Sequence, residues 1–427
     1  MSITVEYTRF RWFVLLTMCI ATMATAVALI SPAPLMGPIA QSMGVTLGEA
    51  TGATMGAFTF CVALSCIVGG ALVDRFGIPR VFICSLLLVI AGQIAVPAVG
   101  TSLGILALLR AVEGAGTGPI MAAVTAIAAQ WFPVHERPIV TGVQGMSMGL
   151  GIAAGFVVAP AVFQLTGNWA AAMAWLSGFC FIGLILTLLM AWGPRVPVVN
   201  DTLGVCNPAI AAGSDFKVAL RQRATWIGIL CVFLLSWASQ AFNDLTPAFI
   251  AVEPPVGIGL GPMEAGKMMM IYQIAFMAGA VASGIITEKI FAGRTKPVVL
   301  LGFLVSAVFC LAIKYTAVTA NSMLLQLCLV GAGFFMSFVN PQVMAFIAKN
   351  YPEHITGKIG GMTMGIGIFG GTAGVIAGSV ALHTTGLYQV SINIVGLVAA
   401  GGFIAAMWLN PPRDFCAIED RDFTLKA

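Results

Sequence analysis

The chain has 427 residues, of which 59% are hydrophobic and only 8% are charged. Soluble globular domains carry roughly 45 to 50% apolar and about 25% charged residues, so a water-soluble fold could not bury this much apolar surface. The net charge of +4 comes from cations in short polar stretches between the apolar runs, so we expect no nucleic-acid partner.

Apolar runs long enough to cross a hydrocarbon layer about 30 Å thick as helices follow one another along the chain. A helix is required because the bilayer interior holds no water to satisfy unpaired backbone groups. The runs also lack the polar and apolar alternation of membrane β-barrel strands. The sequence predicts spans at 12–31, 50–71, 80–100, 103–130, 137–165, 169–192, 225–250, 265–287, 297–316, 321–347, 357–382 and 387–409.

The first apolar run, Trp12 to Ile30, is too long for a signal-peptide core and has no cleavage-type ending, so we expect it to be the first span. The ten cysteines form no C-x-x-C pair and mostly lie inside apolar runs. We therefore expect no disulfide and no metal site. The sequence also lacks a G-x-x-x-x-G-K-[ST] phosphate loop, and we expect no cofactor.

The distribution of Lys and Arg predicts the topology. An even number of spans places both termini on one side, and the loops on that side hold all of the 20 Lys and Arg except Arg110, Lys267 and Lys314. Cytoplasmic loops are enriched in these cations, so we expect both termini to be cytoplasmic in a bacterial inner membrane.

An internal repeat divides the chain. Gly70 to Arg75 recurs as Gly284 to Lys289, 214 residues later, and Met146 to Ile152 recurs as Met362 to Ile368, 216 residues later. Parallel repeats of six spans are a transporter plan that places the solute site at the repeat interface near mid-membrane. We predict an N-terminal six-helix bundle at 1–192, a cytoplasmic linker at 193–224 and a C-terminal six-helix bundle at 225–427.

Two motifs resemble signatures of the major facilitator superfamily. Gly70-Ala-Leu-Val-Asp74-Arg75-Phe-Gly77-Ile-Pro-Arg80 is similar to G-x-x-x-D-R-x-G-R/x-R, and Leu109-Arg110-Ala-Val-Glu113-Gly114-Ala-Gly116 resembles the second signature in the fourth span. The resemblance covers essentially the whole chain. It implies the fold of that family, an all-α membrane protein with twelve transmembrane helices in two pseudo-symmetric bundles, and alternating access driven by a solute or proton gradient rather than by an enzymatic reaction.

The same resemblance implies a breakable gate in the cytoplasmic loops that stabilises the outward-facing state. The alternative is that these cations only keep the loops inside. The predicted gating residues are Asp74, Arg75 and Arg80, with Glu288, Lys289 and Arg294 in the second copy.

Arg110 and Glu113 stand three residues apart in the fourth span and face the same way. An ionisable group at mid-span costs about 2.5 to 3.5 kcal/mol on insertion scales, so its presence needs a reason. Arg110 is predicted to bind an anionic substrate and Glu113 to couple a proton. The alternative is a structural ion pair that neutralises itself.

Asp244 belongs to a polar stripe on the seventh span. It is the second candidate for proton coupling. A residue at the external mouth, or a salt bridge to Lys267, is the alternative. Amide and phenol side chains complete the predicted substrate site, although hydrogen bonds between helices would satisfy them equally well. These predicted substrate contacts are Gln144, Gln240, Asn243, Tyr272, Gln273 and Asn340.

The sequence therefore favours a secondary active transporter of a small organic anion, of carboxylate or sulfonate type, by proton-coupled symport. The expected partners are the solute, protons and the lipid bilayer, with the protein acting as a monomer. An antiporter or exporter of small organic or amphipathic compounds is the alternative within transport. A membrane sensor or assembly factor without transport activity is the alternative of another class.

The topology is tested at Cys416. In a variant that keeps only this cysteine, a membrane-impermeant thiol reagent is expected to label inside-out vesicles and not intact cells, because the C-terminal tail is predicted to be cytoplasmic. Labelling of intact cells would overturn the predicted number of spans.

Overall fold

The computed structural model describes residues 9–99, 102–132, 136–194, 216–351 and 353–412. Within them, 12 helical segments are long and apolar enough to cross a membrane, and each coincides with a predicted span to within a few residues apart from the first, which runs on from Phe10 to Met43. The prediction of a twelve-span, all-helical membrane protein is confirmed. Most of the predicted linker 193–224 and Cys416 lie outside the described residues.

By its contacts, the chain divides into two compact units. Unit 1 holds residues 1–200, 243–274 and 375–391, and unit 2 holds residues 201–242, 275–374 and 392–427. Parts of later helices therefore belong with the first six spans. The division at 193–224 into sequence-contiguous bundles stays a prediction.

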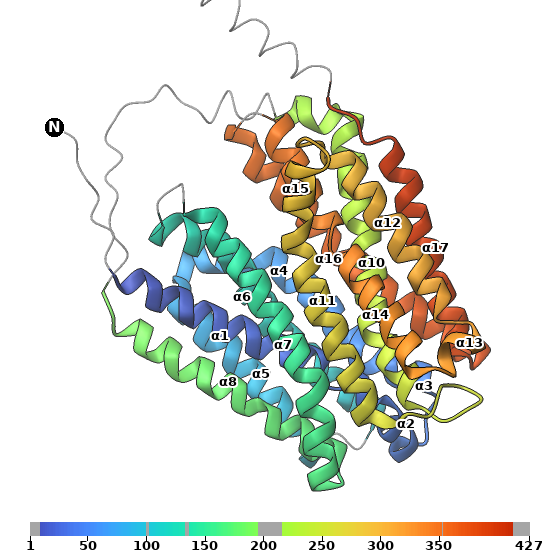
Figure 1. The fold of residues 1–427 in the computed structure, drawn as a ribbon. Coiled ribbons are helices and arrows are strands. Elements are labelled where there is room, and N and C mark those ends of the chain that lie inside the picture. Colours follow the sequence, from blue (N-terminus) through green and yellow to red (C-terminus); the bar gives the residue numbers. More distant parts are fainter. Residues whose placement is uncertain (1–8, 100–101, 133–135, 195–215, 352, 413–427) are drawn as a thin grey trace, which may run out of the picture. The chain divides into compact units, whose positions relative to one another are not determined.

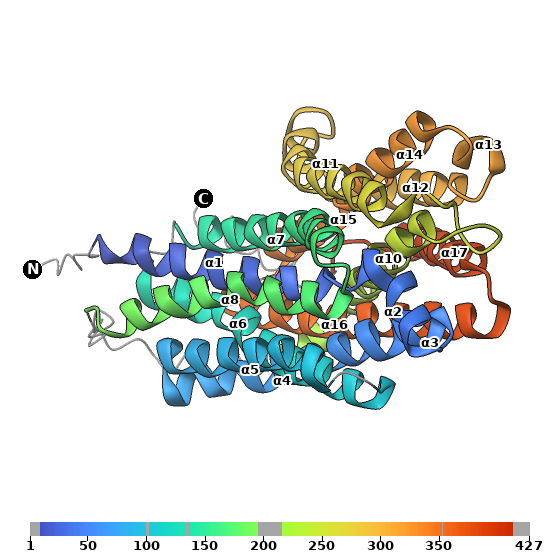
Figure 2. The same cartoon turned by 90° about the horizontal axis from the view of Figure 1, so that it is seen from below.

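Six long helices form most of unit 1. α1 packs against α7 and α8, and α6 packs against α4 and α5. Figure 2 shows α1 running beside α7 and α8. These helices are α1 (Phe10–Ile30), α4 (Ala57–Phe76), α5 (Ile78–Val99), α6 (Leu103–Trp131), α7 (Arg137–Thr166) and α8 (Trp169–Ala191).

Short elements lie between α1 and α4. Pro32 and Pro34 lack the N–H that an α-helix needs, and the chain leaves α1 for a single 3-10 turn, η1 (Ala33–Leu35). After α2 (Met36–Met43), Thr46 caps α3 (Leu47–Thr51) in a capping box with Glu49. A π-helical turn, η2 (Gly52–Gly56), then leads into α4.

Most residues of unit 2 come from helices of the second half (Figure 1). α14 and α15 together make the tenth span, with a break at Ser337, and α12 packs against both. The helices of the second half are α10 (Arg223–Ala251), α11 (Gly261–Lys289), α12 (Thr295–Ala312), α13 (Thr316–Thr319), α14 (Ser322–Met336), α15 (Val339–Asn350), α16 (Glu353–Thr385) and α17 (Tyr388–Met407).

Within unit 1, the start of the second span packs against the end of the eleventh. The hydroxyl of Thr46 lies 3.1 Å from Nδ1 of His383. A Cβ added at Gly48 would lie 2.6 Å from the backbone nitrogen of His383, so α3 and α16 meet here with backbone against backbone. Only glycine leaves room for this approach.

Glycines also set the spacing between α4 and α6. A Cβ at Gly118 would lie 2.6 Å from the backbone nitrogen of Cys66, and a Cβ at Gly114 would collide with the Phe58 carbonyl. A Cβ at Gly104, near the start of the same helix, would have no neighbour within 4 Å. The α4–α6 contact therefore depends on particular glycines rather than on glycine content.

Gly118→Ala is expected to lower the melting temperature of the purified protein, because the added methyl group forces two backbones apart. Overpacking of this kind costs about 1 to 3 kcal/mol. Gly104→Ala is the matched control, and it should leave the melting temperature unchanged or raise it, since alanine is the better helix former. Equal melting temperatures for the two variants would contradict the close packing of α4 on α6.

Candidate functional site

Among the described residues, three Arg, Asp or Glu side chains lie fully buried inside the spans of unit 1. They are Arg110 and Glu113 on α6 and Asp244 on α10, and each has an exposed fraction of 0%. Arg110 Nη1 lies 2.5 Å from Glu113 Oε2, so the two predicted neighbours form an ion pair. Asp244 interacts electrostatically with Arg110. The fold thus brings the two separately predicted charged sites together.

The guanidinium of Arg110 is surrounded by backbone carbonyls. Nε donates to the Thr54 carbonyl, Nη1 donates to the Ala28 carbonyl and Nη2 donates to the Leu29 carbonyl, each at 2.9 Å. The Phe58 ring centroid lies 4.3 Å from the central carbon of the guanidinium, a cation–π distance. One side chain on α6 therefore contacts both α1 and the segment leading into α4.

Glu113 uses one carboxylate oxygen for Arg110. Its other oxygen, Oε1, is buried and has no hydrogen-bond partner among the described residues. A Cβ at Gly92 would collide with the Glu113 side chain, so α5 passes directly beside this carboxylate. A buried oxygen without a partner is costly as an anion and is a favourable place for a proton.

Sequence reasoning missed Gln93, the neighbour of Gly92. Its side chain is fully buried, its Nε2 has no partner among the described residues, and its Oε1 lies 4.0 Å from the Cys180 sulfur. A single amide in the middle of the third predicted span was the available signal, since buried amides in membranes need partners.

The predicted substrate contacts are divided between the two units. Unit 1 holds Gln144, Asn243, Tyr272 and Gln273, and unit 2 holds Gln240 and Asn340. Tyr272, Gln273 and Asn243 are buried, while the others are half-buried. The side-chain oxygens of Asn243, Gln273 and Asn340 have no partner in the described part of the chain, so each keeps an acceptor that a ligand or water could use.

Thr246 was not among the predicted contacts. It lies two residues after Asp244 on α10, is fully buried, and has a hydroxyl oxygen without a partner among residues that the structure describes. The available signal was a threonine next to Pro247, on the span that carries the polar stripe. Lys267, the alternative partner considered for Asp244, forms a salt bridge with Glu264 at 2.7 Å.

The predicted gating residues lie at the ends of helices. Arg75 and Arg80 are exposed at the junction of α4 and α5, and the side chain of Asp74 lies outside the described part. In unit 2, Lys349 on α15 lies 3.4 Å from Glu288 and donates to the Gly293 carbonyl at 3.0 Å. Lys349 is thus a partner of the second copy of the gating motif, and the sequence alone did not predict it.

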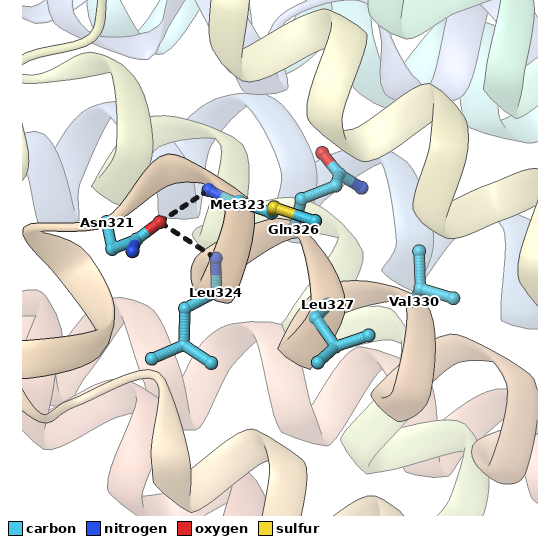
Figure 3. A pocket seen from close by; sticks show the side chains of 6 residues that line it. All are labelled: Asn321, Met323, Leu324, Gln326, Leu327 and Val330. Carbon is cyan, nitrogen blue, oxygen red and sulfur yellow. Dashed lines mark hydrogen bonds between the residues drawn. The ribbon is translucent and has the colours of Figure 1, made fainter.

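A surface pocket occurs in unit 2 at the start of α14 (Figure 3). Asn321 Oδ1 accepts from the N–H groups of Met323 and Leu324 and so caps the helix there. By the repeat spacing, Leu327 and Val330 in this pocket correspond to Arg110 and Glu113. The second half therefore has an apolar surface where the first half has a buried ion pair. The pocket is lined by Asn321, Met323, Leu324, Gln326, Leu327 and Val330.

Two curated proteins with matching sequences are described as transporters of organic acids. The chain is 24% identical over 403 residues to the probable sulfoacetate transporter SauU of Cupriavidus necator, and the match covers 87% of each chain. It is 24% identical to the sialic acid transporter NanX of Escherichia coli, with 76% of this chain and 75% of that protein covered.

A solved structure has a similar fold. The bacterial homologue of the human lysosomal transporter Spinster, in an inward-facing and unoccupied conformation, matches with a TM-score of 0.76 and 14% sequence identity. The match covers 94% of this chain and 98% of that one. The model of the Major Facilitator Superfamily matches residues 15–295 and 255–415, nearly the whole chain. The chain therefore belongs to the major facilitator superfamily.

Proposed function

We propose that the protein transports a small organic anion of carboxylate or sulfonate type by proton-coupled symport. Proteins of its family move small solutes across membranes and are not enzymes. The observation that carries the finer proposal is the buried group of Arg110, Glu113 and Asp244 in unit 1. In such a group the charge on the carboxylates and the binding of an anion depend on each other.

The charge balance supports symport over uniport. With both carboxylates ionised, Arg110 is outnumbered, and the group repels an anion in a medium where Coulomb interactions are strong. One proton makes the group neutral, and a second leaves an excess of positive charge that attracts an anion. Because each proton raises the affinity for the anion, the anion raises the affinity for protons by the same factor.

The assignment of roles follows from this balance. Arg110 supplies the positive charge that an anion needs, and Glu113 or Asp244 takes the coupling proton. The unpartnered oxygens of Asn243, Gln273 and Asn340 are acceptors for hydroxyl or amine groups of the solute. Gln144, Gln240 and Tyr272 stay predicted contacts.

The names of the relatives favour the same solute class. One is described as a probable sulfoacetate transporter and the other as a sialic acid transporter, so both names refer to organic acids. By the Lys and Arg distribution, we place the protein in a bacterial inner membrane with both termini in the cytoplasm. The exposed loop cations Arg75, Arg80, Lys289 and Arg294, with Asp74 and Glu288, are the proposed cytoplasmic gate.

Purified protein in liposomes should accumulate at least one member of a panel of small carboxylates and sulfonates that includes sulfoacetate and sialic acid. Accumulation is expected to exceed that of empty liposomes several-fold with an inward acid gradient and to collapse when a protonophore removes it, since the proton supplies the driving force. Uptake that ignores the gradient would reject symport. Transport of amphipathic cations in place of every anion would reject the solute class.

Glu113→Gln and Asp244→Asn separate the two candidates for the proton. The variant that removes the coupling carboxylate is expected to lose gradient-driven accumulation about tenfold or more while it still exchanges labelled for unlabelled anion, because exchange needs no net proton movement. Glu264→Gln removes a half-exposed carboxylate and is the matched control, with no change expected. Gradient-driven accumulation that survives in both core variants would remove both carboxylates from the mechanism.

A further inference from the structure

The last turn of α1 contains a carbonyl whose backbone hydrogen-bond donor is missing. In an α-helix the Ala28 carbonyl accepts from the N–H of residue 32, and residue 32 is a proline without an N–H. The backbone remains helical through Ser31 and Pro32, so the geometry for that bond is present and only the donor is missing. Two side chains donate to the Ala28 carbonyl instead. The Ser31 hydroxyl does so at 3.1 Å and Nη1 of Arg110 at 2.9 Å, and of these two only Arg110 comes from another helix.

The segment leading into α4 has a second irregularity. In η2 the N–H of Ala57 reaches back five residues to the Gly52 carbonyl, which is the wider pairing of a π-helix. Thr54 lies inside this turn, and its carbonyl accepts from Nε of Arg110 at 2.9 Å. The Phe58 ring, one turn after Thr54, lies against the guanidinium.

We propose that Arg110 is a positioning residue that holds the break of α1 at Pro32 and the π-helical turn before α4 together on α6. Its three nitrogens point to three carbonyls on two segments, and the fully buried side chain places this arrangement away from water. A guanidinium can do this because its donors form a rigid planar fork, whereas an ammonium has one donor nitrogen on a flexible stem. The role adds to the proposed transport function, on which its effect on uptake rests.

Membranes supply the physical reason. Without water in the hydrocarbon region, a carbonyl freed by a proline break must be satisfied by side chains, which at Ala28 are the Ser31 hydroxyl and Nη1 of Arg110. Broken helices in transporters are tolerated where another group satisfies the freed backbone. Arg110 supplies these donors and still keeps Glu113 as its counterion.

The test combines Arg110→Lys with two proline substitutions. Arg110→Lys keeps the charge and removes the fork, so amide hydrogen exchange in peptides covering residues 28–39 and 52–60 is expected to speed up about tenfold. Pro32→Ala restores the N–H that faces the Ala28 carbonyl, and in the double variant it should return the 28–39 peptide toward wild-type exchange. Uptake of whichever anion the wild type transports should recover in parallel.

Pro34→Ala is the matched control. Pro34 removes the donor for the Ile30 carbonyl, and among the described residues Arg110 donates to Ala28 and Leu29 but not to Ile30. Pro34→Ala should therefore not rescue Arg110→Lys. Equal rescue by both proline substitutions, or rescue by neither, would overturn the proposal.

Two further outcomes keep the test decisive. If Arg110→Lys yields no monodisperse protein, recovery of monodisperse protein with Pro32→Ala and not with Pro34→Ala supports the proposal, and recovery with neither rejects it. If Arg110 instead acts by touching the anion, Arg110→Lys raises the KM for uptake and Pro32→Ala leaves it raised, with exchange in both peptides unchanged. Hydrogen exchange and monodispersity need no substrate, so failure of the proposed function would not disturb this readout.

Discussion

Polar groups buried in the spans cannot hydrogen-bond to water, so they must find partners within the protein. The arrangement of unit 1 depends on this constraint. The N–H donors of a buried guanidinium must therefore find acceptors in the protein. Arg110 finds them in three backbone carbonyls and one carboxylate, with an aromatic ring against its face. The same constraint acts on the carbonyls, since Pro32 leaves one of them without a helical donor. The buried guanidinium thus gains an acceptor, and the carbonyl freed by Pro32 gains a donor.

The buried charges of unit 1 combine hydrogen bonds to the backbone with an electrostatic group. An arginine whose three nitrogens all have acceptors is well suited to a structural role. It still carries the positive charge of the group. Glu113 has one bound and one unpartnered oxygen, and Asp244 lies within electrostatic reach of the same guanidinium. The same guanidinium donates to the last turn of α1 and to the π-helical turn before α4, so in the proposed transport a change of charge here would act on both segments.

The two halves of the chain share a scaffold and differ in its chemistry. Motif residues such as Gly70 and Gly284 recur at nearly constant spacing, and glycines in both halves allow close approach of helices. Gly151 meets the backbone of α1, and Gly370 meets the backbone of α10. The charges do not recur, because Leu327 and Val330 stand where the first half has Arg110 and Glu113. An asymmetric solute needs asymmetric contacts, whereas helix packing benefits from repetition.

The lengths of the apolar runs and the loop charges between them predicted the twelve spans, because a helix needs about 20 apolar residues to cross a bilayer. They also singled out Arg110, Glu113 and Asp244, since charge in hydrocarbon is rare and visible without a structure. Only the tertiary structure decided that Asp244, more than one hundred residues away, lies within electrostatic reach of Arg110. It alone showed the contact of Arg110 with the Ala28 carbonyl, the π-helical turn at 52–56 and the Gln93 side-chain nitrogen that has no partner among the described residues. Span length is a property of one segment, but a hydrogen bond between a side chain and a distant carbonyl depends on where two helices meet.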